Sequence, residues 1–241
     1  MNDSIESKRF IAQDRAITLV AIDLNPAMMS PDILGYSGVI PTDWEMASDP
    51  VYTPSNVQIT FTNGVNILAQ GHQVIFAEPF EISSQIAALA QQFIRAFPNL
   101  QYKGSTLNLR GYLPTQYPPG HYISDTWLAK GPWQDDCARA ALNLVYKREN
   151  SKKENPSLEL ALTEAMMNTQ AGESIPIILF SGRYGYAAKG NTSAEIGSYL
   201  AGKLDNIQQD TDHYSHIVNS KFVQAHERAA IDRQPKLALT S

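Results

Sequence analysis

Apolar and polar residues alternate along several segments of the chain, and this alternation predicts strands. Residues 57–62, 65–70 and 73–78 each show it, with Asn63-Gly64 between the first two and Gly71-His72 between the second and third. Asn-Gly accommodates the positive φ angles of a type I′ turn, which matches the twist of paired strands. The sequence therefore predicts an antiparallel three-stranded meander.

Five further segments have the composition of strands because their apolar residues alternate with polar ones or form short runs. They cover residues 16–24, 102–113, 138–149, 157–166 and 175–186. Gly182 and Gly185 interrupt the last segment, and glycines inside a strand predict a bulge or bend.

Helical spacing of apolar residues predicts three helices. The first covers residues 82–96 and ends at Pro98, and a short one is expected over 121–130. The third is a long C-terminal helix over 193–226, in which apolar residues from Leu200 to Phe222 recur at steps of three or four.

Each half of the chain thus shows three consecutive strands followed by a helix. Runs of strands followed by a helix indicate an α+β fold with a mostly antiparallel sheet, and the order suggests two pseudo-repeated βββα halves. Polar residues such as Gln58, Thr60 and Asn108 occupy alternate strand positions. We therefore expect helices on one sheet face, and water or a partner on the other.

The chain has 241 residues, of which 43% are apolar, and this suits one globular domain. We expect this domain to span residues 15–229, with halves at about 15–114 and 134–229. The polar end segments 1–14 and 230–241 are expected to be flexible.

Charge and composition exclude several classes of protein. The net charge of -5 gives no basic footprint, so we expect no nucleic-acid partner. No run approaches the roughly 18 apolar residues that a membrane helix needs, and the polar N-terminus is unlike a signal peptide. Cys137 is the single cysteine and cannot form an internal disulfide. A soluble cytoplasmic protein is the expectation.

Two proline-rich segments contain several aromatic and apolar residues. They are the long segment 25–56 and the segment 112–133. Aromatic residues are enriched at protein interfaces. Their candidate partner-binding residues are Met28, Met29, Tyr36, Trp44, Tyr117, Tyr122, Trp127 and Trp133. The alternative is that these segments only cover the core.

The main functional hypothesis is a non-catalytic adaptor or scaffold that binds another protein or itself through these loops or the C-terminal helix. The alternative is an enzyme that binds a small molecule or phosphate at the glycine-containing turn 182–192. Its anion-binding residues would be Arg183, Lys189 and Gly190 because a glycine-rich turn before a helix can hold an anion.

Other chemistry has weak support in the sequence. His213 and His216 lie three residues apart on the last predicted helix, with Asp210 nearby, but a metal site needs a better-defined third ligand. No phosphate-loop, dinucleotide, C-x-x-C or H-E-x-x-H motif is present. We therefore assign no catalytic residue, metal or cofactor.

Overall fold

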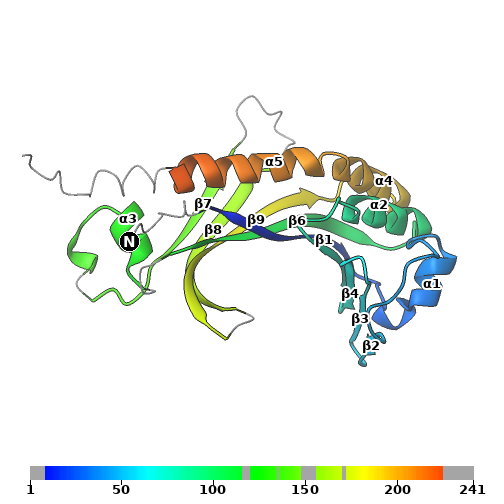
Figure 1. The fold of residues 1–241 in the computed structure, drawn as a ribbon. Helices are drawn as coiled ribbons and strands as arrows, with labels where there is room; N and C mark the ends of the chain where they lie inside the picture. Colours follow the sequence, from blue (N-terminus) through cyan, green and yellow to red (C-terminus); the bar gives the residue numbers. More distant parts are fainter. Residues whose placement is uncertain (1–8, 116–119, 135, 148–155, 170–171, 225–241) are drawn as a thin grey trace, which may run out of the picture.

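The computed structural model describes residues 9–115, 120–134, 136–147, 156–169 and 172–224. They form an α+β fold around one nine-stranded antiparallel sheet, in the order β2-β3-β4-β5-β1-β6-β9-β8-β7 (Figure 1). The strands are β1 (Ile11–Ala21), β2 (Val51–Tyr52), β3 (Asn56–Thr60), β4 (Asn66–Gln70), β5 (Gln73–Pro79), β6 (Tyr102–Pro114), β7 (Ala141–Tyr146), β8 (Leu158–Asn168) and β9 (Ser174–Ala187). The predicted α+β class and antiparallel sheet are confirmed.

The predicted meander is present as β3, β4 and β5. Gly64 and Gly71 turn the chain between these strands with φ angles of +89° and +54°, which glycine adopts at little cost. The Asn63 side chain accepts a hydrogen bond from the amide of Val65 and tightens the first turn. The first loop is longer than the predicted two-residue type I′ turn, because Phe61 faces Val65 and Thr62, Asn63 and Gly64 lie between them. The second turn contains only Gly71 and His72, as predicted.

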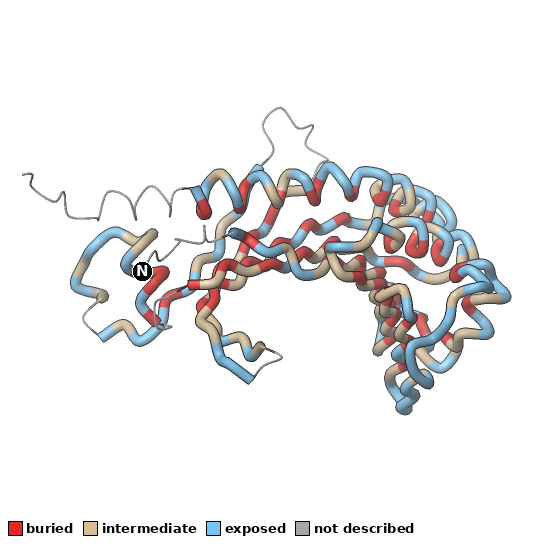
Figure 2. Tube along the Cα trace, viewed as in Figure 1, coloured by how far each residue is buried: buried red, intermediate tan, exposed pale blue. Residues whose placement is uncertain are grey.

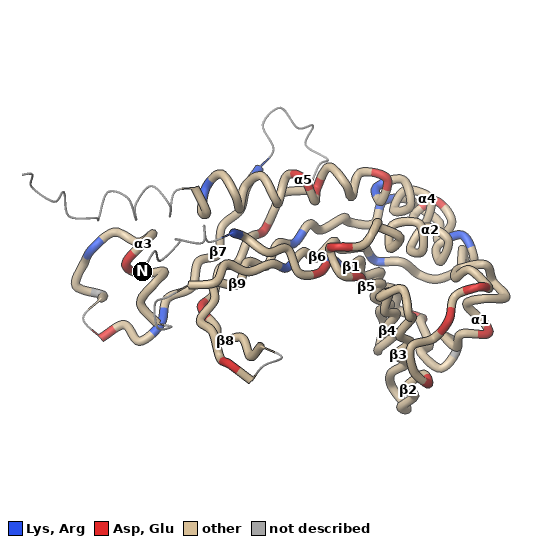
Figure 3. The backbone as a smooth tube through the Cα atoms, in the orientation of Figure 1, with Lys and Arg blue, Asp and Glu red and all other residues tan. Residues whose placement is uncertain are grey.

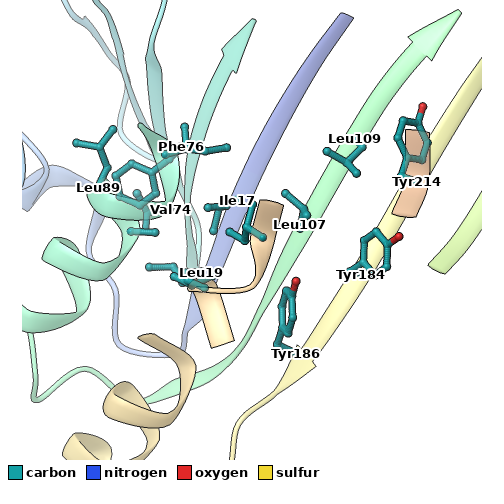
Figure 4. Close-up of a cluster of buried hydrophobic side chains, with 14 of the residues drawn as sticks. Ile17, Leu19, Val74, Phe76, Leu89, Leu107, Leu109, Tyr184, Tyr186 and Tyr214 are labelled. Atoms are coloured by element: carbon teal, nitrogen blue, oxygen red, sulfur yellow. The ribbon is translucent and has the colours of Figure 1, made fainter. Parts of the chain in front are cut away.

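The sheet is strongly arched, and its convex face is covered by α2 (Ile86–Ala96), α4 (Ser193–Leu204) and α5 (Ile207–Ile217) (Figure 1). Strand residues on this face lie beneath the helices and are buried, whereas those on the other face are half-buried or exposed, so burial alternates along the strands (Figure 2). Ile17, Phe76, Leu107 and Tyr184 belong to the resulting core, between the central strands and the helices (Figure 4).

The single long helix predicted over 193–226 is not confirmed, and its last two residues lie outside the described residues. Helix α4 ends at Leu204, α5 begins at Ile207, and a π-helical turn, η3 (Val218–Val223), follows. Asp205 and Asn206 stand at the break, and both residue types disfavour helix interiors because their side chains compete for backbone groups. The break lets α4 and α5 each lie against the arched sheet. One straight helix would lose contact with the sheet at one end.

The proline-rich segment 25–56 contains two short helices. They are η1 (Pro26–Met28) and α1 (Pro31–Tyr36), and each begins with its proline. Proline suits the first helical position because its missing N–H would be unpaired there anyway. The side chains of Asn25 and Ser30 cap these helices.

The strand order reads alike from the centre outward in both directions. From β1 the sheet continues through β5, β4 and β3, and from β6 it continues through β9, β8 and β7. A short α-helix follows each central strand, α1 after β1 and α3 (Tyr122–Trp127) after β6. A 3-10 turn, η2 (Pro132–Gln134), lies between α3 and β7. A helix also follows each meander, α2 after β5 and α4 after β9.

No helix in the described ranges combines the length and the apolar character needed to cross a membrane.

Burial of tyrosines predicts a loss of stability in alkali. Tyr214 is buried, and its hydroxyl donates a 3.0 Å hydrogen bond to the carbonyl of Phe180. Burial, assisted by Asp14 and Tyr184, raises the pKa of Tyr214 above its usual value. The folded state therefore favours the neutral phenol. The contribution of the neutral Tyr214 phenol to the free energy of unfolding is complete at pH values below the tyrosine pKa of the unfolded chain, near 10. It is lost as the pH rises above that value, by up to about 1.4 kcal/mol per pH unit.

We expect Tyr214→Phe to reduce this alkaline slope, because phenylalanine has no proton to lose. Urea titrations between about pH 9 and pH 11 measure it, since that range spans the ordinary tyrosine pKa. Tyr36→Phe is the control, since the Tyr36 side chain is 97% exposed. An unchanged slope in the Tyr214 variant would contradict the expectation.

Candidate functional site

The concave face of the sheet is the candidate binding surface. It consists of the alternate strand residues whose side chains point away from α2, α4 and α5. No described helix or loop crosses it beneath the central strands (Figure 1). At its centre Ala16 of β1 pairs with Asn108 of β6, and Asn108 pairs with Arg183 of β9. These strands are far apart in sequence, so only the tertiary register brings these residues together.

Several side chains around Asn108 and Arg183 at the centre of the concave face are small. Thr18 pairs with Thr106, Thr106 with Gly185, and Ser181 with Ala161. Most intervening positions on the opposite face carry larger residues, such as Leu107, Phe180 and Tyr184, with Gly182 as an exception. This difference in size favours the arch because the concave side of a bent sheet has less room. It also lets an approaching chain come close to the strand backbones.

The charged groups of the concave face neutralise one another. Arg110 donates two hydrogen bonds to Asp14, at 2.9 and 2.7 Å, and Arg183 forms an ion pair with Glu159 at 3.1 Å. The hydrogen bond to Asp14 raises the pKa of Arg110. Within the described ranges, Lys and Arg positions are scattered singly along the backbone (Figure 3). The face is therefore polar without a strong field of either sign.

Apolar residues flank this polar centre on both sides. Leu68 of β4 lies opposite Ile75 of β5, and Tyr112 of β6 lies opposite Leu179 of β9. All four side chains are half-buried. A central polar area with apolar patches beside it is a composition suited to contact with another protein.

A row of side-chain amides stands at one rim of the concave face. Asn56, Gln70 and Gln73 are cross-strand neighbours, and Val20 follows Gln73 in the same row. They line an open cavity of about 380 Å³ beside His72. These three side-chain amides make no hydrogen bond within the described part of the chain. Each amide can both donate and accept, which matches an uncharged polar group such as a peptide main chain.

Within the described strands, the concave face carries hydroxyl groups but no histidine or cysteine side chain. None of the nine strands contains a histidine or a cysteine. Its carboxylates Asp14 and Glu159 are engaged by arginines, and neither lies in an apolar pocket of the kind that prepares a carboxyl for proton transfer. What the surface offers is shape, hydrogen bonds and apolar contact.

The predicted partner-binding residues whose side chains the structure describes lie in different surroundings and are not gathered on one surface. Met29 is 3% exposed and Tyr122 is buried, so both belong to the core. Trp44 is half-buried with its ring 5.0 Å from that of Phe61, and Trp127 is half-buried beside Tyr122. Tyr36 stands nearly free in solvent at the end of α1. Tyr117 and the side chains of Met28 and Trp133 lie outside the described residues.

The structure separates the predicted anion-binding residues. Arg183 points into the concave face and pairs with Glu159, whereas Lys189 lies 5.5 Å from the ring of Tyr199 on α4, across the sheet. Gly190 has φ of +144° and packs against Glu195 and Ile196. At the start of α4, Thr192 accepts from the amide of Glu195, and the Glu195 carboxylate accepts from the amide of Asn191. An anion would have to compete with that carboxylate.

The histidines of α5 do not converge. His213 forms a 2.8 Å hydrogen bond with the hydroxyl of Tyr184, while His216 is exposed. Asp210 is buried and accepts a hydrogen bond from Tyr186. Over the described ranges, no group of three or more His, Cys, Asp or Glu residues is placed to hold a metal ion.

Sequence reasoning missed the residues of the concave face as candidates. The polar alternation at Thr60 and Asn108 indicated an uncovered face, but it did not show which strands lie side by side. No protein-family model and no curated protein sequence matches this chain.

Proposed function

We propose that this protein is a non-catalytic protein-binding or assembly protein of the cytoplasm that holds a partner on its concave face. The observation that carries the proposal is the uncovered inner side of the arched sheet, where the rows across β1, β6 and β9 present small and polar side chains (Figure 1). The described helices α2, α4 and α5 lie on the opposite face.

The chemistry of the surface favours a polypeptide over a nucleic acid or a charged small molecule. Arg110 and Arg183 are already paired with Asp14 and Glu159, so they do not form a basic track for phosphates. The amide row at Asn56, Gln70 and Gln73 supplies hydrogen bonds suited to main-chain groups. The apolar pairs that flank the polar centre supply apolar surface, whose burial against a partner would favour binding.

We also propose that the two halves of the fold are pseudo-repeats. The matching succession of strand, short helix, meander and helix on either side of the β1–β6 boundary supports this relation. A pseudo-two-fold axis would then pass between β1 and β6, through the centre of the concave face. A partner would lie across that centre, with the exposed Tyr36 as an additional contact outside it.

A bulky charge at the centre of the concave face tests the proposal. We expect Ala16→Arg to weaken partner retention at least about tenfold, because an unpaired arginine in a close interface costs more than about 1.4 kcal/mol. The measurement is affinity capture from an extract of the source organism, followed by titration of the captured partner. Ala88→Arg is the matched control, since Ala88 is exposed on α2.

The proposal expects a partner that the native protein and the Ala88 variant retain and the Ala16 variant loses. Circular dichroism melting curves establish that both variants are folded. Capture of no protein by the native chain, or equal capture by all three, would show that the concave face is not a binding surface.

A further inference from the structure

The two edges of the sheet differ in how they are protected. Unpaired edge strands invite other strands, and proteins block them with short length, proline and charge. The β2 edge has these features, since it is only two residues long, lies between Pro50 and Pro54 and follows Asp49. The β7 edge is six residues long, and its sequence Ala-Leu-Asn-Leu-Val-Tyr contains no proline and no charge.

The outer side of β7 is open in the described part of the chain. Its backbone pairs with β8 in unbroken register from Ala141 to Tyr146, and its residues make no further backbone hydrogen bond. Val145 is 65% exposed, and Ala141 and Asn143 beside it are exposed as well. One row of outward backbone donors and acceptors is therefore available to a further strand.

We propose that a second copy of this chain pairs with β7, so that two sheets join edge to edge as an antiparallel dimer. A two-fold axis at Leu144 places Leu144 of each copy opposite the other. It also places Leu142 opposite Tyr146 and Asn143 opposite Val145. This register keeps core-side residues on one face and concave-side residues on the other, as strand alternation requires.

A second copy fits this edge because the edge is complementary to itself. Leu142, Leu144 and Tyr146 are half-buried and pack against the core, so the core is incomplete along this side. The same row from a second copy would continue it with apolar cross-strand pairs. No like charges meet within the strand, and Lys147 would lie opposite Ala141 rather than opposite its own equivalent.

The oligomeric mass of the full chain, measured by light scattering and by sedimentation over a range of concentrations, tests this pairing. We expect the native protein to be a dimer. The double variant Asn143→Lys with Val145→Lys sets lysines opposite each other at two places across the two-fold axis, and it should be a monomer. The double variant Asn143→Glu with Val145→Lys instead sets opposite charges in the same places and should restore the dimer.

Val51→Lys on β2 is the control, since it adds the same charge to an exposed valine of the other edge and should leave the dimer intact. A native protein that stays monomeric at every concentration would overturn the inference. So would a dimer that survives the paired lysines, or one that the Val51 variant disrupts. A monomer that still retains a partner on its concave face would leave the proposed function standing.

Discussion

Replacing Arg15 by methionine is expected to lower the free energy of unfolding by about 3–5 kcal/mol, because it leaves a buried carboxylate without its cation. Arg15 of β1 donates to Glu78 of β5 at 2.6 Å, and the two side chains are 7% and 0% exposed. Arg15 also donates to the carbonyl of Ile82 at 2.7 Å. The Glu78 carboxylate in turn accepts from Ser84 and from the amide of Gln85. The pair therefore fixes the start of α2 to the sheet.

Arg110→Met is the matched control for this prediction. Arg110 makes a two-bond ion pair with Asp14 across the neighbouring strands, but its side chain is 57% exposed. An exposed pair contributes at most about 1 kcal/mol, so the control should lose little stability. Urea unfolding at neutral pH measures both variants. Equal losses of unfolding free energy in the two variants would show that burial of the Arg15–Glu78 pair does not increase the cost of removing its arginine.

Removing both charges separates the cost of an unpaired charge from the value of the pair itself. The double variant Arg15→Met with Glu78→Met is expected to recover part of the stability that Arg15→Met loses, because no charge then remains buried. The remaining deficit would reflect the lost attachments to Ile82, Ser84 and Gln85.

Sequence patterns predicted those parts of the fold that depend on neighbours along the chain. The β3–β4–β5 meander is one such part, since the glycines of its two turns and the alternation between them are local signals. Helix α2 is another, since its buried residues Ile86, Leu89 and Phe93 follow helical spacing. The same spacing continued past Leu204 and predicted one helix, because periodicity does not register the curvature of the sheet beneath it.

The candidate site could be predicted only in outline. Polar residues at alternate positions indicated an uncovered face, but Asn108 meets Ala16 and Arg183 only because β6 pairs with β1 and β9. Arg15 and Glu78 likewise lie 63 positions apart, and nothing local marks them as a pair. Composition also favoured the aromatic loops as contact surfaces, whereas Met29 and Tyr122 of these loops are buried in the core.

Gly182 lies in β9 for a reason that the sequence pattern did not show. The glycines of β9 predicted a bulge or a bend, and the register of β9 with β6 and β8 continues through Gly182 without a shift, so no bulge is present there. The structure gives another reason for this glycine: a Cβ at Gly182 would lie 2.5 Å from the Tyr214 ring, whose hydroxyl is held by the carbonyl of Phe180. The glycine makes room for α5.

We therefore expect Gly182→Ala to destabilise the protein by about 1–3 kcal/mol, at the upper end because the ring cannot move without losing its hydrogen bond. Gly185→Ala, three residues along the same strand, meets no atom within 4 Å on the concave face and should be neutral or raise stability by up to about 1 kcal/mol. Urea unfolding of both variants measures the difference. Equal effects would mean that contact between α5 and β9 does not require a glycine, and the packing of Tyr214 would no longer explain Gly182.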